Sequence, residues 1–195
     1  MATYKSIRYN TLLVNASSQV LLAETTASSS ATLSFTSGID STYKEYLFEF
    51  INIHAATDSE HLTFNMSVDG GSNYNVTKTS TAFQAYHREN DEANPAVAYS
   101  TSHDLAQSTD YQRLMIGMGT DNDQNGCGTL KLFNPSSTTF VKHFIANINN
   151  TEANDYQTQW FIAGYGNTTS AIDAVQFKMS SGNIDAGTIK MYGIN

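Results

Sequence analysis

Val175-Gln176-Phe177-Lys178-Met179 and Thr188-Ile189-Lys190-Met191-Tyr192-Gly193-Ile194 are two runs in which apolar and polar residues alternate. Such alternation, with a period of two, is typical of a β-strand that is buried on one face. The segment between the runs, 180–187, is rich in Ser, Gly, Asn and Asp, which favour turns. A strand that reaches the last residue needs partners in a sheet to keep it from fraying. The sequence therefore predicts that the chain closes on a β-sheet.

Further strands are predicted at short intervals upstream of these runs. Tyr46–Ile53 is largely apolar on both faces, which suits a strand in the middle of a sandwich. Asp69-Gly70-Gly71 has hairpin chemistry, because glycine adopts a positive φ at no steric cost, so a return strand is expected from Tyr74 and Val76. Only Asp104–Leu114 could form a helix of a few turns. The other predicted strands are 31–35, 62–68, 111–118, 129–133, 141–148, 159–165 and 174–179.

Short strands at this spacing predict an all-β fold, an antiparallel β-sandwich that is jelly-roll-like. The chain has only 2 Pro residues, so its strands can pair freely. We expect the sandwich to cover residues 31–195. Residues 1–30 carry two short apolar patches and a polar stretch, and we interpret them as a short N-terminal arm that anchors the protein to a neighbour. The alternative is that they form the first strands of the sandwich.

The composition restricts the class of partner. The 195 residues suit one domain, 40% of them are hydrophobic, and the formal net charge is −8. Only 10 residues are Lys or Arg and they are scattered, so we expect no nucleic-acid partner and no anionic membrane partner. The apolar patches at 12–14 and 20–23 are separated by polar residues, which argues against a signal peptide. We therefore expect synthesis in a cytoplasm without export by the ordinary route.

The sharpest local motif is Asp121-Asn122-Asp123-Gln124-Asn125-Gly126, which matches the opening of a calcium loop. Asp121, Asp123 and Asn125 would be the ligands. The twelfth position of such a loop should be Glu, however, and here it is Leu132. The same residues also favour an ordinary turn, which is the preferred interpretation. No other metal site and no cofactor are predicted.

Other reactive residues give no catalytic pattern. The charged run 87–92 is expected to be a solvated loop, although a glycosidase carboxylate pair could not be seen in a sequence. The histidines are dispersed, and Cys127 lies in a turn-like setting without a recognisable base. Trp160 could stack on a sugar, but its neighbours favour a core strand. We therefore predict no catalytic residue.

Several segments together resemble a β-sandwich module of virion proteins from tailed bacteriophages. The segment 180–193 is similar to the Gly-Asn-Ile-x-x-Gly-Thr-Ile-(basic)-(Leu or Met)-Tyr-Gly ending of such proteins. Tyr46–Ile53 followed by Ser67–Gly71, and Leu132-Phe133-Asn134-Pro135, occur in the expected order. The resemblance implies a non-enzymatic structural or adhesive protein, often a homotrimer, of the phage particle.

These observations lead to one main hypothesis and two alternatives. The main hypothesis is a capsid decoration (cement) or short head-fibre subunit, made in the host cytoplasm and located in the virion. It would bind other virion proteins, either the major capsid protein or a tail protein. The first alternative is a receptor-binding tail-fibre tip that binds host surface glycan through exposed aromatic and Asn or Asp side chains. The second is a small glycan hydrolase.

Overall fold

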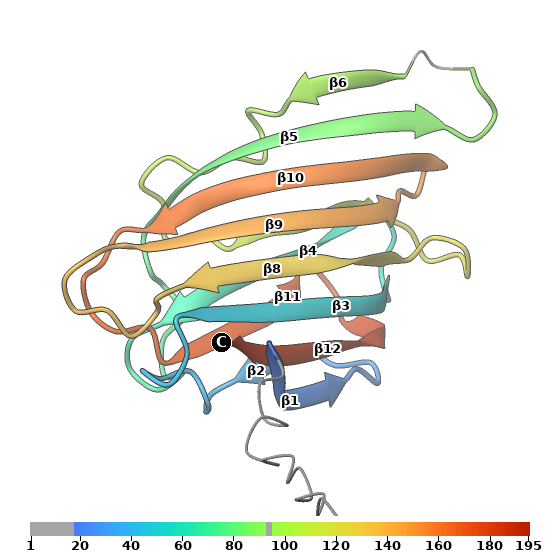
Figure 1. The fold of residues 1–195 in the computed structure, drawn as a ribbon. Coiled ribbons are helices and arrows are strands. Elements are labelled where there is room, and N and C mark those ends of the chain that lie inside the picture. The colour runs from blue at the N-terminus through green and yellow to red at the C-terminus, as the bar shows by residue number, and fades with distance from the viewer. Residues whose placement is uncertain (1–17, 93–94) are drawn as a thin grey trace, which may run out of the picture.

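The computed structural model describes residues 18–92 and 95–195, which form two antiparallel sheets (Figure 1). The large sheet has the order β1-β12-β3-β8-β9-β10-β5-β6, and the small sheet the order β2-β11-β4-β7. The strands are β1 Gln19–Thr26, β2 Leu33–Phe35, β3 Glu45–Ala55, β4 Glu60–Ser67, β5 Lys78–Arg88, β6 Ala96–Tyr99, β7 Gln112–Met118, β8 Gly126–Phe133, β9 Lys142–Thr151, β10 Tyr156–Gly166, β11 Ala174–Met179 and β12 Ile184–Ile194.

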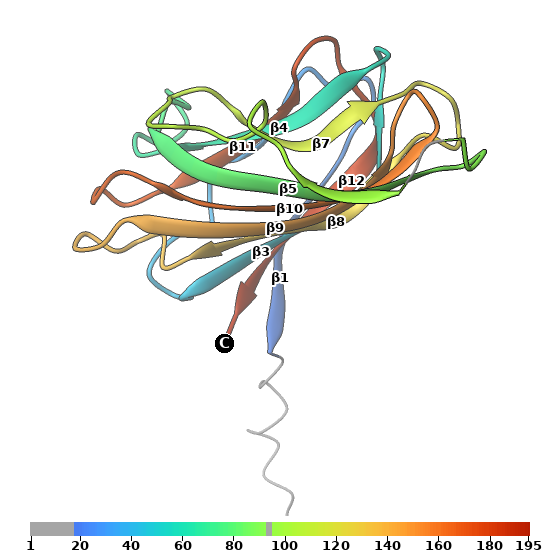
Figure 2. The same ribbon diagram turned by 90° about the horizontal axis from the view of Figure 1, so that it is seen from above.

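The small sheet covers one face of the large sheet, as Figure 2 shows from above, so the predicted all-β sandwich is confirmed. The jelly-roll type is not confirmed: a jelly roll has eight strands in all, whereas residues 18–92 and 95–195 form sheets of eight and four strands. The described residues include no helix long and apolar enough to cross a membrane.

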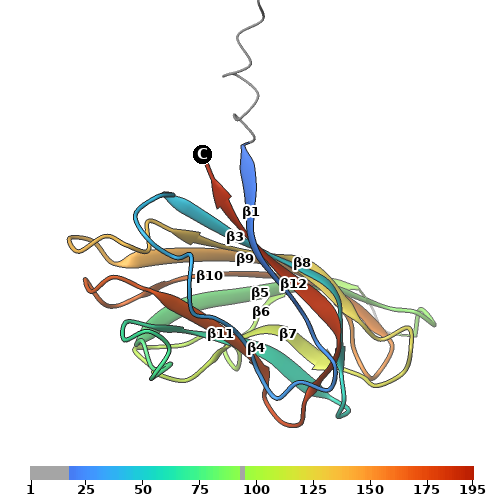
Figure 3. The same cartoon turned by 90° about the horizontal axis from the view of Figure 1, so that it is seen from below.

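The two closing runs form strands, as predicted, but in different sheets. β11 lies between β2 and β4 in the small sheet, whereas β12 lies between β1 and β3 in the large sheet. The turn after Met179 therefore carries the chain across the sandwich. The end of β12 pairs with the start of β1, Ile194 opposite Gln19, so both ends of the described chain lie side by side (Figure 3). The expectation that the terminal strand is tied into a sheet is confirmed.

Phe177 of β11 is at the centre of the aromatic core between the sheets. Its ring centroid lies 5.4 Å from that of Phe48 and 5.3 Å from that of Phe50, both edge-to-face. Phe35 of β2 packs at 6.1 Å in the same way. Edge-to-face contacts stabilise aromatic pairs by about 0.5–1.5 kcal/mol beyond the area that they bury. The apolar positions of the alternating run thus face the core, as the pattern predicted.

The expected return strand from Tyr74 and Val76 is wrong in its start and its pairing. The strand begins at Lys78, and β4 and β5 belong to different sheets. The segment Asp69–Asn73 is a loop held by the Asp69 carboxylate, which accepts the Asn73 backbone N–H at 2.9 Å and the Ser67 hydroxyl at 2.7 Å. The Asn73 side-chain amide, which donates to Asp69 Oδ2 at 2.7 Å, contributes most, and together these hydrogen bonds lower the pKa of Asp69 to about 2. The turn residues therefore mark a crossing between sheets, not a hairpin.

The possible helix at Asp104–Leu114 is also wrong. The segment before β7 is a loop whose backbone pairs with β5: Leu105 O accepts from Ser80 N at 2.9 Å, and Ser108 O accepts from Lys78 N at 2.7 Å. Pairing with β5 satisfies backbone groups that a helix would have bonded internally. The strand itself, predicted at 111–118, is present as β7.

The predicted arm is partly built into the sandwich. Gln19–Thr26 is β1, the edge strand beside β12, and Ser30 forms a β-bridge with Ile184. This matches the alternative that part of residues 1–30 belongs to the sandwich. Residues 1–17 lie outside the described residues, so an anchor in that segment stays a prediction.

Two lysines are fully buried at one end of the sandwich, on either side of Gly166. Gly166 of β10 pairs with Lys78 of β5 on one side and with Lys142 of β9 on the other. The Lys78 Nζ donates to Asn65 Oδ1 at 2.6 Å. Burial lowers the pKa of Lys78 to about 7, against the smaller opposing effect of Asp110. Burial also lowers the pKa of Lys142.

Candidate functional site

Four neighbouring strands, β9, β10, β5 and β6, direct alternate side chains away from the small sheet. Phe144, Trp160 and Ala82 belong to the inward set and are buried, so the residues between them lie on the outer face. We call this outer set the neutral face, because it contains no Asp, Glu, Lys or Arg. Its members are Thr79, Thr81, Phe83, Ala85, His87, Val97, Tyr99, His143, Ile145, Asn147, Asn149, Thr151, Gln157, Gln159, Phe161, Ala163 and Tyr165.

An aromatic row crosses the neutral face. Tyr99 of β6 is opposite Phe83 of β5, which is opposite Phe161 of β10. The Phe83 and Phe161 rings are stacked, with centroids 4.9 Å apart and planes inclined by 13°. Adjacent strands are themselves about 4.8 Å apart, so the two rings face each other across the strand gap and stand upright on the sheet. The Phe83 and Phe161 pair therefore presents ring edges, rather than ring faces, to a ligand.

A cluster of amides continues the face over β9 and β10. The Gln159 Nε2 donates to Asn147 Oδ1, and the Gln159 Oε1 accepts from Asn149 Nδ2 at 3.3 Å. Asn149 Nδ2 also donates to the Thr158 carbonyl at 3.3 Å. Within the described chain, Asn147 Nδ2 and Asn149 Oδ1 have no partner. These two groups remain available as a donor and an acceptor.

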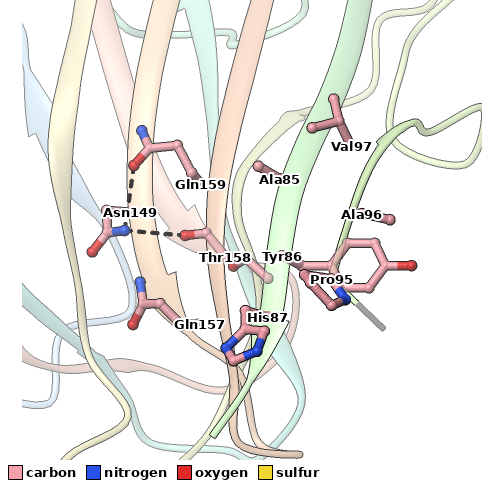
Figure 4. Close-up of a pocket in the computed structure, with 10 residues that line it drawn as sticks. All are labelled: Ala85, Tyr86, His87, Pro95, Ala96, Val97, Asn149, Gln157, Thr158 and Gln159. Atoms are coloured by element: carbon pink, nitrogen blue, oxygen red, sulfur yellow. Dashed lines mark hydrogen bonds between the residues drawn. The ribbon is translucent and has the colours of Figure 1, made fainter. Parts of the chain in front are cut away.

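A shallow depression of about 470 Å³ lies beside the amides, between β9, β10, β5 and β6 (Figure 4). Asn149, Gln157 and Gln159 line one side of it, and Val97 and Pro95 line the other. Because its walls combine apolar side chains with neutral hydrogen-bonding groups, the depression suits an uncharged ligand or an uncharged protein surface.

The predicted calcium ligands lie in the turn between β7 and β8. The Asp121 carbonyl oxygen is 3.2 Å from the His54 Nε2 and also accepts the Gln124 N–H at 2.9 Å, so this residue uses its backbone in the turn. Among the described residues, no group of three or more His, Cys, Asp or Glu side chains is placed to hold a metal ion. For Asp121, Asp123 and Asn125 the preferred turn interpretation and the weaker calcium alternative therefore both stay predictions.

Trp160 is a core residue, as its neighbours indicated. It is 1% exposed on the inward side of β10, and its ring contacts that of His103 at 5.3 Å between centroids. A buried indole cannot stack on a sugar, so the hypothesis that Trp160 is a sugar platform is wrong. The exposed aromatic residue nearest to it in the sequence is Phe161, on the opposite face of the strand.

Two of the histidines that are dispersed in the sequence come together in the structure. The rings of His61 and His103 lie 5.8 Å apart, and the Arg113 Nη1 is 2.8 Å from the His103 Nδ1. Burial, assisted by the Arg113 charge, lowers the pKa of His61 to about 4. The sequence reasoning missed this cluster because β4, β7 and a loop contribute one residue each, with no characteristic spacing.

The charged run and the cysteine have structural surroundings. The run begins in the last two residues of β5 and its polar contacts are local: the His87 Nε2 lies 3.0 Å from the Asp91 Oδ1, and Arg88 pairs with Glu92 at 3.6 Å. Cys127 is half-buried on β8, where its sulfur accepts the N–H of Asn52 at 3.3 Å. Neither feature adds a catalytic group to the neutral face.

No protein-family model matches the chain, and no curated protein or solved structure matches it. A functional assignment therefore depends on the surface described above and on the resemblance of the closing segment.

Proposed function

We propose that the protein is a non-enzymatic structural subunit of a bacteriophage particle, a capsid decoration (cement) or short head-fibre protein. The observation that carries the proposal is the neutral face, an uncharged sheet surface on which five large apolar side chains are exposed among neutral polar ones. Exposed apolar patches of several hundred Å² mark sites of protein contact. The closing segment 180–193, whose resemblance suggested this role, contributes β12 of the same sheet.

A decoration protein binds by burying surface, and symmetry multiplies weak contacts into avidity. An uncharged sheet face suits this task, because no ion must lose its hydration when the surfaces meet. In this proposal the subunit is a homotrimer in the virion, and its partners are other virion proteins, with residues 1–17 as the candidate anchor.

Immunogold labelling of purified phage particles, with an antibody against this chain, tests the location. Gold over the head is the expected result. Label confined to the tail end would favour a receptor-binding role instead. An absence of label on particles of a phage whose genome encodes this chain would contradict the proposed virion role.

The amide cluster favours a second candidate, a glycan-binding tail-fibre tip. Asn147 and Asn149 offer a donor and an acceptor next to an open depression, and neutral sugars bind through such groups. A glycan array with the wild type and with Asn149→Ala tests this candidate. Loss of one glycan signal in the variant would support it, and no binding by the wild type would reject it.

A further inference from the structure

We infer that a second copy of this chain packs on the neutral face. The inference rests on the proposed assembly function, and it names the surface and the partner that this function would use. Its test needs only the purified chain, so it can succeed or fail independently of where the protein lies in a particle.

The first reason is the concentration of apolar side chains. The described chain exposes eight large apolar residues, and five of them are on the neutral face: Phe83, Val97, Tyr99, Ile145 and Phe161. Val97 is 74% exposed and Ile145 is 51% exposed. Exposed apolar side chains gathered on one sheet face are a surface that lacks its partner.

The second reason is the distribution of charge within one sheet. The half of the outer face formed by β1, β12, β3 and β8 carries ion pairs, with Lys131 2.7 Å from Glu45 and Lys190 3.8 Å from Glu24. The half formed by β9, β10, β5 and β6 carries none of these residue types. Two copies with a net charge of −8 repel each other, and the neutral face is where they can meet without opposing carboxylates.

The third reason is size. Strands lie about 4.8 Å apart and rise about 3.3 Å per residue, so three strands of 10 or 11 residues and the 4 residues of β6 give the neutral face a projected area of roughly 540 Å². A standard interface buries about 800 Å² of accessible surface on each partner, and side-chain relief makes accessible area larger than its projection. The face is therefore large enough for a stable contact between copies.

The geometry of the polar and aromatic groups favours a protein partner over a sugar. A sugar stacks on the face of an aromatic ring, but the faces of Phe83 and Phe161 are turned toward each other. The amides of Asn147, Asn149 and Gln159 are largely bonded to one another. Upright ring edges can interdigitate with side chains from another sheet, in the way that the two layers of a sandwich pack about 10 Å apart.

Light scattering coupled to size-exclusion chromatography, and sedimentation equilibrium, test the inference on the full chain. The wild type should have a mass of at least two 21.3 kDa subunits. The double variant Val97→Asp, Ile145→Asp should weaken association at least about a hundredfold. Val68→Asp is the matched control, since Val68 is 39% exposed and outside the neutral face, and it should associate like the wild type. Should the double variant not fold, Val97→Asp alone serves, at the most exposed position.

Three outcomes would overturn the inference. The first is a wild type that is monomeric at about 100 µM. The second is an oligomer whose mass the folded Val97→Asp variant leaves unchanged. The third is a monomer that binds a glycan in a manner sensitive to Asn149→Ala, which would assign the face to sugar. If the purified chain forms an oligomer through the neutral face, but phage particles show no gold label, this inference stands and the virion role is rejected.

Discussion

Replacing Lys78 by Met should make the protein more stable at about pH 6, although it removes two hydrogen bonds. Lys78 is fully buried, and its Nζ donates to Asn65 Oδ1 and to the Val76 carbonyl at 2.7 Å. Its pKa falls to about 7 because burial penalises the ammonium. Methionine fills a similar volume with no charge.

The magnitude follows from the two pKa values. The ordinary pKa of lysine is 10.5 and that of Lys78 is about 7. At about 1.4 kcal/mol per pH unit, the free energy of unfolding is therefore roughly 5 kcal/mol lower when the native protein must carry this proton. In the variant Asn65 Oδ1 keeps the Met66 N–H at 2.8 Å, but the Val76 carbonyl loses its donor, at a cost of about 1–3 kcal/mol. A net gain of about 2–4 kcal/mol remains, or a rise in melting temperature of about 4–16 °C.

The gain must also depend on pH with a definite sign. Between about pH 7 and 10.5 the unfolded chain binds the Lys78 proton and the native protein does not, so wild-type stability rises with pH through this window. Below about pH 7 both states bind the proton and the penalty is complete. The advantage of the variant is therefore largest at about pH 6 and shrinks toward pH 10.

Urea unfolding, followed by the fluorescence of Trp160, measures these differences, because this is the single tryptophan and it is buried. Lys131→Met is the control: Lys131 is solvent-exposed beside Glu45, so its replacement should change the free energy of unfolding by less than about 1 kcal/mol. A Lys78→Met variant that is less stable than wild type at about pH 6 would refute the reasoning, since the hydrogen bonds would then outweigh the desolvation of the ammonium.

Two further predictions concern a carboxyl group and a glycine. Burial raises the pKa of Glu152 to about 7, so the unfolded chain releases this proton at lower pH than the native protein, and the stability contribution falls as pH rises from about 4.5 to 7. Glu152→Gln should therefore raise the melting temperature at about pH 8 and leave it nearly unchanged at about pH 4, as thermal melts would show. Gly187 has φ 112°, and an added Cβ would lie 2.6 Å from the Asn52 carbonyl oxygen, so Gly187→Ala should cost more than about 2 kcal/mol in urea unfolding. Gly70→Ala, at φ 71° with no atom within 4 Å of the added Cβ, should cost only about 1 kcal/mol; equal losses would contradict the close-approach argument.

The strands that the sequence predicted well are those with one buried face. β11 alternates Val175, Phe177 and Met179 inward with Gln176 and Lys178 outward, and this contrast is what a period of two detects. Turn residues were less informative, because they show where the chain changes direction but not which sheet it joins next. The pairing of β5 with β10 instead of β4 depends on contacts between residues that are far apart in the sequence, so the residues within each strand do not indicate it.

The neutral face was not predictable from the sequence as a site. Its residues come from four strands spread over positions 79–165, and only the register places Tyr99, Phe83 and Phe161 in one row. The general expectation of exposed aromatic and amide side chains did point to such a surface. Trp160, for which the sequence offered sugar stacking only as the weaker alternative, faces the core as its neighbours indicated, and the exposed ring is that of the next residue, Phe161.

The places where alternation fails also indicate which outer surface needs a partner. In Trp160-Phe161-Ile162-Ala163 the run is apolar throughout, which a sequence reader assigns to a strand covered on both sides. Trp160 and Ile162 face the interior of the sandwich and are 1% exposed, whereas Phe161 faces outward and is 37% exposed. The sequence thus has the composition of a doubly covered strand, while the single chain covers it only once. If β10 is covered on both faces in the working protein, the second cover must come from another molecule. The absence of charge on the neutral face favours a contacting surface that is itself uncharged, as the neutral face of a second copy is.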